Sequence, residues 1–127
     1  MMRTFITLLL MAAFVTADAQ EVMRKEKDGT YVVNTTTLAQ DVNGYIGPTP
    51  VEIYIKKNKI EKVEVLKNQE TPKYMAKVKK AMLTAWDGLT VKEAKSKQVD
   101  AVTGATFTSK ALIENVQRGL DHYQKNK

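Results

Sequence analysis

A stretch near the middle of the chain alternates between apolar and polar residues, and this alternation constrains the fold more than any other feature. In residues 51–56 every odd position is Val or Ile and every even position is polar or Tyr. Lys57-Asn58-Lys59 can turn the chain because Asn tolerates a left-handed backbone, and residues 60–66 resume with Val63 and Val65 facing inward. We therefore expect a β-hairpin with one apolar face, and a second layer must cover that face.

Two amphipathic helices after the hairpin can supply that layer. Thr71-Pro72 suits an N-cap followed by proline at the first helical position, and residues 73–86 then show helical spacing, ending at Asp87-Gly88. The expected buried positions of this helix are Tyr74, Val78, Ala81, Met82 and Ala85. A second helix is predicted over residues 107–124, where Leu112, Val116, Leu120 and Tyr123 recur every three or four residues. A short helix over residues 91–95 fits between them.

The segment before the hairpin is less regular. Residues 20–27 are polar and are expected to form a loose entry segment, and Asp28-Gly29 then signals a turn. Residues 30–37 are rich in β-branched side chains and predict an edge or meander strand. Residues 38–50 form a loop in which Tyr45 and Ile46 either contact something outside the domain or fold under onto the core. The expected fold class is α+β, a small antiparallel sheet (meander or hairpin) packed against two amphipathic helices.

The start of the chain has the pattern of a signal peptide. Met1-Met2-Arg3 is a short basic start, residues 4–15 are apolar, and Ala17-Asp18-Ala19 is a small-x-small cleavage pattern. The apolar run is shorter than the roughly 20 residues that a membrane-spanning helix needs. We expect residues 1–19 to be cleaved near Ala19, leaving residues 20–127 as a single exported domain that is soluble in the periplasm or another extracytoplasmic space.

Composition excludes most catalytic centres. The chain has no cysteine and one histidine, His122, so neither a disulfide framework nor a transition-metal site of His and Cys ligands is expected, and a Ser-His-Asp triad is disfavoured. Any redox chemistry would need a cofactor. The net charge of +6 favours a negatively charged ligand or partner. Nucleic acid is not expected, since beyond the leader only Arg24 and Arg118 are arginines.

Small residues and hydroxyls concentrate in residues 100–109, directly before the last helix. Gly104 lets a ligand approach the backbone, Ala105 adds little bulk, and Thr106, Thr108 and Ser109 stand where the helix begins. Free N–H groups at a helix start favour an anion, so these groups could converge on a phosphate. Ordinary helix capping by a hydroxyl after a glycine turn explains the same residues, and physical reasoning alone leaves both interpretations open.

The run Asp100-Ala101-Val102-Thr103-Gly104-Ala105-Thr106, followed by Phe107-Thr108-Ser109, resembles the flavinylation signature of the FMN-binding domain family. That family includes the extracytoplasmic C subunit of the sodium-pumping NADH:quinone oxidoreductase and the G subunit of the Rnf electron-transport complex. Gly44-Tyr45-Ile46-Gly47, the hairpin with Asn58 and Glu70-Thr71-Pro72 follow in the family's order. Two departures are Thr103, where serine is commoner, and Lys73-Tyr74, where a glycine is frequent.

The resemblance implies that FMN is joined through its phosphate to Thr106 by a flavin transferase that uses FAD and magnesium. It implies that Asp100 opens the signature, that Thr103, Gly104 and Ala105 shape the loop, and that Glu70 and Thr71 line the isoalloxazine side. The full expected cofactor-binding set is Thr106, Asp100, Thr103, Gly104, Ala105, Thr108, Ser109, Glu70, Thr71 and Tyr45. Tyr45, Tyr74 and Trp86 are candidates to pack on the ring. No catalytic residue and no metal ligand is expected.

The leading hypothesis is an exported electron-transfer flavoprotein domain that carries FMN on Thr106 and shuttles electrons between redox partner proteins, some of them membrane-associated. The alternative is an exported module that binds FMN or another phosphate-bearing ligand without attachment and without electron shuttling. A small FMN-dependent reductase ranks third, because no obvious acid or base of a substrate pocket accompanies the loop. An electron carrier is thus favoured over a stand-alone enzyme.

Overall fold

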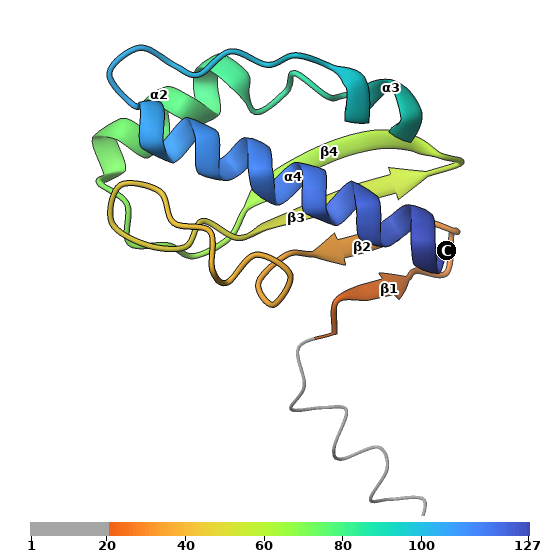
Figure 1. Ribbon diagram of the computed structural model, residues 1–127. Helices are drawn as coiled ribbons and strands as arrows, with labels where there is room; N and C mark the ends of the chain where they lie inside the picture. Colours follow the sequence, from red (N-terminus) through yellow and green to blue (C-terminus); the bar gives the residue numbers. More distant parts are fainter. Residues whose placement is uncertain (1–20) are drawn as a thin grey trace, which may run out of the picture.

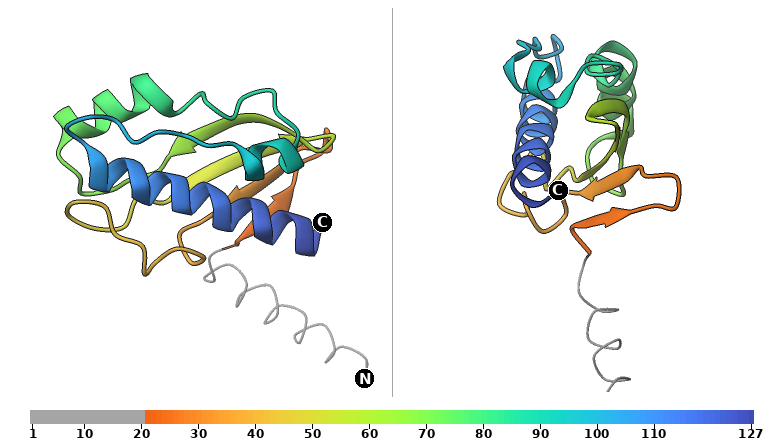
Figure 2. Two further views of the ribbon diagram at one scale, coloured as in Figure 1. Left: turned by 45° about the horizontal axis from the view of Figure 1, so that its top comes forward. Right: turned by 90° about the vertical axis from the view of Figure 1, so that its right-hand side faces the viewer.

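The computed structural model describes residues 21–127, which form a four-stranded antiparallel sheet with helices over one face (Figures 1 and 2). The strands, β1 (Met23–Lys25), β2 (Tyr31–Asn34), β3 (Val51–Lys56) and β4 (Lys59–Val65), pair in chain order. The helices are α2 (Pro72–Met82), α3 (Val91–Ser96) and α4 (Thr106–Asn126). The α+β class is confirmed, and the predicted signal peptide lies outside the described residues. No helix within residues 21–127 combines the length and hydropathy of a membrane span.

The predicted hairpin is confirmed as β3 and β4. Lys57 and Asn58 have φ values of 53° and 64°, so both central residues of the turn are left-handed, as a type I′ turn requires. Tyr54 pairs with Lys62, but the next residue, Ile55, pairs with Ile60. Glu61 is therefore an extra, unpaired residue in β4, which makes a β-bulge. Because of this bulge, Ile60 and Val63 both face the core although they are three positions apart, while Val65 is only half-buried.

The entry segment was wrongly expected to be loose. Residues 23–25 pair with β2, and the turn between the strands uses Gly29 at φ 92°. The backbone N–H of Thr30 donates to the Asp28 carboxylate in the same turn. A three-residue strand is too short to show an alternating pattern in the sequence, so it is recognised only from its pairing with β2 in the structure. As a result β2 lies inside the meander and is not an edge strand.

The helix after the hairpin is shorter than expected, and its buried face was predicted only in part. It ends at Met82, and tight turns follow to Gly88, whose N–H donates to the carbonyl of Ile60 and so returns the chain to β4. Its buried residues are Met75, Val78 and Met82. Val78 and Met82 are buried as predicted, but Tyr74 and Ala81 were wrongly assigned to that face and are exposed, because the buried face is set by Met75, Val78 and Met82 at three- and four-residue spacing.

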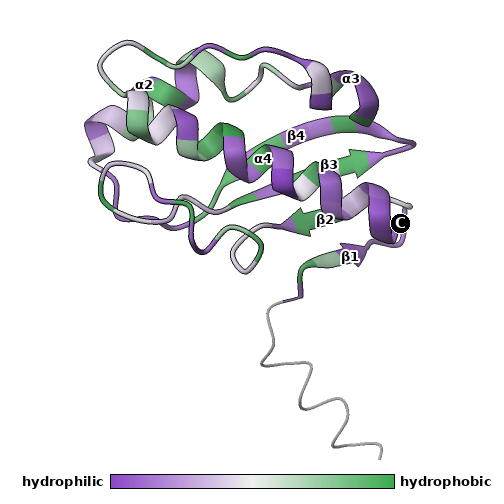
Figure 3. Cartoon of the chain, viewed as in Figure 1, coloured by the Kyte–Doolittle hydropathy of each residue, from purple (hydrophilic) through white to green (hydrophobic). Residues whose placement is uncertain are grey.

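The long α4 helix packs across the sheet and forms the main core contact. Hydrophobic segments of β2, β3 and the first half of α4 contrast with the hydrophilic last turns of α4 in Figure 3. Leu112, Val116 and Leu120 are fully buried, as predicted. A buried polar link also joins the two layers, since the Thr35 hydroxyl donates to Asn115 Oδ1 at 2.5 Å and accepts from the backbone N–H of Val51. This packing fixes where α4 begins relative to the sheet.

Gly119 lets α4 approach the sheet closely, and enlarging it should destabilise the protein. A Cβ at this position would lie 2.5 Å from Ile53 Cδ1 and 3.1 Å from Thr35 Cγ2. Helix propensity favours alanine over glycine by about 1 kcal/mol, but overpacking a core costs about 1–3 kcal/mol. We expect Gly119→Ala to lower the free energy of unfolding measured in urea. Ile53→Val removes the clashing carbon, so the double variant should lose less than the sum of the single losses; strict additivity would contradict the close approach.

Candidate functional site

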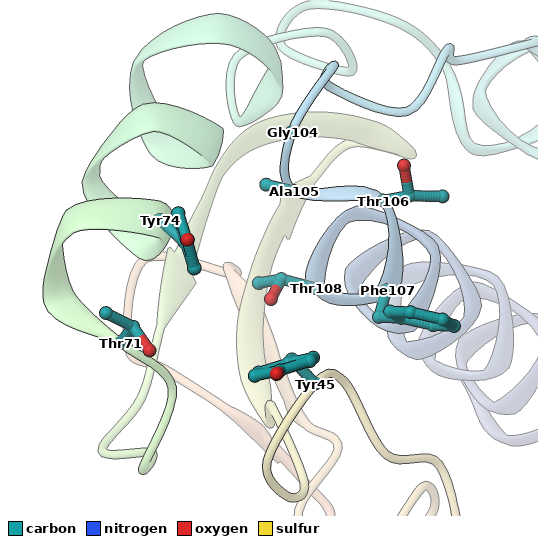
Figure 4. A pocket seen from close by; sticks show the side chains of 8 residues that line it. All are labelled: Tyr45, Thr71, Tyr74, Gly104, Ala105, Thr106, Phe107 and Thr108. Carbon is teal, nitrogen blue, oxygen red and sulfur yellow. The ribbon is translucent and has the colours of Figure 1, made fainter.

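A cleft of about 520 Å³ opens at the end of the domain where three distant segments meet, and this volume is within the range of small-molecule sites, roughly 300–1,000 Å³ (Figure 4). Tyr45 comes from the loop before β3, Thr71 and Tyr74 from the start of α2, and the remaining wall from the start of α4. The lining residues are Tyr45, Thr71, Tyr74, Gly104, Ala105, Thr106, Phe107 and Thr108. The cleft therefore includes most of the predicted cofactor-binding residues.

The start of α4 presents unpaired backbone donors to this cleft. Ala105 is the N-cap residue and provides no side-chain cap, and the N–H of Ser109 donates to its carbonyl as the first helical bond. The N–H groups of residues 106–108 precede that bond and so have no partner within the helix. The first turn carries no acidic residue. The backbone reaches this start through Gly104 at φ 87°, where a Cβ would lie 3.5 Å from the Lys77 ammonium nitrogen. This end of α4 thus favours an anion.

The hydroxyls of the loop do not converge, contrary to expectation. The buried Ser109 hydroxyl donates to the carbonyl of Ala105 at 2.7 Å and accepts from the N–H of Val102 at 3.0 Å, which fastens the loop to the helix. The buried Thr108 hydroxyl donates to Glu70 at 2.6 Å. Thr106 is exposed, lines the cleft, and is the one of these three whose hydroxyl is free of hydrogen bonds to residues 21–127. Side-chain capping, the competing interpretation, does not occur at α4 either.

Glu70 lies behind the cleft wall and holds it together. Its side chain is 5% exposed, and its carboxylate accepts hydrogen bonds from the backbone N–H groups of Tyr45, Ile46 and Gly47 at 2.8, 2.7 and 3.0 Å. Thr108 supplies a fourth donor. Burial raises the pKa of Glu70, but the hydrogen bonds from Thr108 and from these N–H groups outweigh it and hold the pKa below its ordinary value. Glu70 is not among the lining residues, so the geometry does not place it beside a ring in the cleft.

Exposed apolar side chains gather at the same end of the domain. Tyr45 is 65% and Phe107 64% exposed, and their rings stack with centroids 6.3 Å apart. Ile46 and Tyr74 complete the set of large exposed hydrophobic residues in the described chain. Tyr45 and Ile46 therefore do not fold onto the core. Trp86, a predicted ring contact, is fully buried in the core and does not line the cleft.

Phe107 was missed as a wall residue. The signal was present in the sequence, because Phe107 is an apolar residue in the first turn of α4 that lies outside the phase of the buried positions. Of the other predicted residues, Asp100 and Thr103 are exposed and lie outside the lining, and Ser109 lies behind it. In the part of the chain that the structure describes, no three His, Asp or Glu residues lie close enough to hold a metal ion.

The fold and the site define a small α+β ligand-binding domain in which an uncapped helix start adjoins an aromatic cleft. A family comparison agrees with this assignment: the model of the FMN-binding domain matches residues 44–121, which include all three walls of the cleft. The chain belongs to the FMN-binding domain family, and FMN is the cofactor that this membership supports. No curated protein and no solved structure matched the chain significantly.

The low pKa of Glu70 predicts a dependence of stability on acid. Because the folded-state pKa lies below the unfolded value of about 4.3, Glu70 adds stability at higher pH that is lost as the pH falls through the folded-state pKa. We expect the free energy of unfolding, measured in urea from pH 7 to pH 3, to fall less steeply in Glu70→Gln than in the wild type. Asp28, Asp41 and Glu93 also have lowered pKa values and contribute equally to both proteins. Equal slopes would contradict an ionised, hydrogen-bonded Glu70.

Proposed function

We propose that this protein is an exported electron carrier with FMN attached by a phosphoester bond to Thr106. One observation carries the proposal: among the hydroxyls at the start of α4, that of Thr106 is exposed in the cleft, whereas those of Thr108 and Ser109 are buried and hydrogen-bonded. In the attachment step the Thr106 oxygen would bond to the FMN phosphorus of FAD, the pyrophosphate bond would break, AMP would leave, and the hydroxyl proton would pass to solvent.

The residues of the cleft fit a phosphate with an attached aromatic ring. The N–H groups of residues 106–108 are oriented to stabilise phosphate oxygens, and Lys77 adds a positive charge near Gly104. Tyr45, Tyr74 and Phe107 offer aromatic surface in the same cleft, with Phe107 next to Thr106 and Tyr74 across the opening (Figure 4). FMN bound there would supply one- and two-electron redox chemistry, while the protein binds, orients and partly shields it.

The lining residues support electron transfer over catalysis on a substrate. None of the eight lining residues is Asp, Glu, His or Lys, so the lining offers no carboxylate, imidazole or amine to act as a general acid or base. The covalent link supports a carrier that works outside the cytoplasm, since an attached cofactor cannot diffuse away. An exported module that binds FMN or another phosphate-bearing ligand without attachment remains the second candidate, because the helix start favours an anion with or without an ester.

We also propose two kinds of partner. A flavin transferase that uses FAD and magnesium would attach the cofactor, and redox proteins, some of them membrane-associated, would exchange electrons with it. The α2 helix supports an acidic docking surface on the redox partners, because its charged residues are all lysines and it has no acid. These lysines are Lys73, Lys77, Lys79 and Lys80. None of them takes part in the ion pairs recorded within residues 21–127.

Replacing Thr106 tests the attachment. The wild-type chain, co-expressed with a flavin transferase and analysed by intact-mass spectrometry, should gain the mass of FMN minus water, and Thr106→Ala should lose this gain completely. Thr84→Ala is the matched control and should keep the gain, because it removes an exposed threonine hydroxyl outside residues 100–109. A mass gain that survives in Thr106→Ala would reject this acceptor. An unmodified wild type that binds FMN reversibly would favour the second candidate, and the absence of both would reject both candidates.

The lysines of α2 should steer charged electron acceptors to the cleft. Oxidation of the reduced flavoprotein by anionic ferricyanide should slow as ionic strength rises, while oxidation by cationic hexaammineruthenium(III) should accelerate. Lys77→Glu should slow the ferricyanide reaction several-fold. Lys125→Glu, at the far end of α4, changes the net charge equally and should have a smaller effect. Rates that are independent of ionic strength, or equal effects of the two variants on the ferricyanide reaction, would contradict steering by α2.

A further inference from the structure

We propose that Glu70 is a positioning residue that assembles the flavin cleft without contacting the flavin. Its carboxylate fixes residues 45–47 to the first turn of α4, and thereby sets Tyr45 beside Phe107 and Thr106. The inference rests on the proposed function only for the identity of the ligand. It differs from the role that the family resemblance implies, in which Glu70 lines the isoalloxazine side.

The hydrogen bonds of Glu70 leave no room for a ligand. Oε1 accepts from the N–H of Tyr45 and from the Thr108 hydroxyl, while Oε2 accepts from the N–H groups of Ile46 and Gly47. Each carboxylate oxygen therefore has two donors, which satisfies its usual capacity. Three consecutive N–H groups that converge on one anion form a nest, here filled by a side chain of the same protein.

The loop is shaped to fit this carboxylate. Gly44 donates its N–H to the carbonyl of Gly47 at 2.8 Å, and Asn43 pairs with Pro48, so the loop closes into a tight turn. A Cβ on Gly44 would lie 2.5 Å from Glu70 Oε1, closer than a real contact allows. Gly44 is therefore required by the approach of Glu70 and not by its own backbone angle, which is not left-handed.

Glu70 is itself held at the start of α2. Its N–H donates to Asn68 Oδ1 at 3.0 Å, and Thr71, the next residue, accepts the first bonds of α2 from Tyr74 and Met75. One side chain thus connects the three segments that supply the walls of the cleft: the loop, α2 and α4. Apolar packing contributes little to holding this loop, because the side chains of Tyr45 and Ile46 are largely exposed.

Charge and shape both matter at this position. A glutamine keeps the size of the side chain, but it offers one accepting oxygen and directs an NH₂ group at donors, so at least two of the four hydrogen bonds are lost. Hydrogen bonds to a charged group are among the stronger ones in proteins. The loop should therefore detach from α4 when the carboxylate is replaced, while the core, which contains no part of residues 44–47, should remain folded.

Amide hydrogen exchange of the flavin-free protein tests this inference. In Glu70→Gln, exchange at Tyr45, Ile46 and Gly47 should accelerate by about tenfold or more, whereas exchange in β3 and β4 stays unchanged. The fluorescence of Trp86, fully buried in the core, reports whether the variant is folded. Unchanged exchange at residues 45–47 in a folded Glu70→Gln protein would overturn the inference.

Thr108 provides an independent pair of variants if Glu70→Gln does not fold. Thr108→Val keeps the shape and removes the donor, and it should accelerate exchange at residues 45–47 several-fold; Thr108→Ser keeps the hydroxyl and should restore the wild-type rate. Equal rates in the valine and serine variants would contradict the link between the loop and α4.

Flavinylation separates this inference from the proposed function. After co-expression with a flavin transferase, the flavinylated fraction of Glu70→Gln should fluoresce more strongly and show weaker visible circular dichroism than the flavinylated wild type, because Tyr45 is no longer held near the flavin. If the wild type gains no mass, the proposed function fails while the exchange rates still decide the role of Glu70. If the wild type is modified and exchange in the variants is unchanged, only the role of Glu70 is rejected.

Discussion

A single buried carboxylate organises the functional end of this domain. Taking a carboxylate out of water is costly unless donors replace the solvent, and Glu70 receives four of them, three from residues 45–47 and one from Thr108 at the start of α4. The stabilisation is mutual, because the N–H groups of the exposed Tyr45 and Ile46 and of the buried Gly47 would otherwise need another acceptor. The walls of the cleft therefore depend on electrostatics and hydrogen bonding, whereas the rest of the domain depends on apolar packing between α4 and the sheet.

These two kinds of stabilisation meet in α4. Its middle buries Leu112, Val116 and Leu120 against the sheet, which fixes the helix rigidly, and its first turn carries the free N–H groups and the exposed Thr106. Gly119 and the Thr35–Asn115 bond set how closely the helix lies on β3. A ligand bound at the first turn thus contacts an element with little freedom to move, which lowers the entropic cost of holding it.

The sequence predicted the elements with strong periodicity and failed where tertiary contacts decide. Alternation and a left-handed Asn58 were enough for the hairpin, and helical spacing was enough for α4. The short β1 strand was missed because a three-residue strand has no period, and in α2 Tyr74 was taken as buried in place of its neighbour Met75 because the exact edge of a buried face is decided by the layer it packs on. Hydroxyl-rich composition located the site, but only packing shows that Thr108 and Ser109 are buried while Thr106 is exposed. The partnership of Glu70 with residues 45–47 joins positions far apart in sequence and had no local signal.

The direction of α4 also determines how the domain can be presented to other molecules. The helix begins at the cleft and ends beside the turn of the β3–β4 hairpin, where the Tyr123 hydroxyl donates to Asn58 Oδ1 at 2.6 Å (Figure 1). A helix of this length is about 30 Å long, so Lys127 and the cleft lie at opposite ends of the fold. An attachment made through the C-terminus, to a solid support or to a fused protein, therefore orients the domain with its cleft pointing outward and unobstructed.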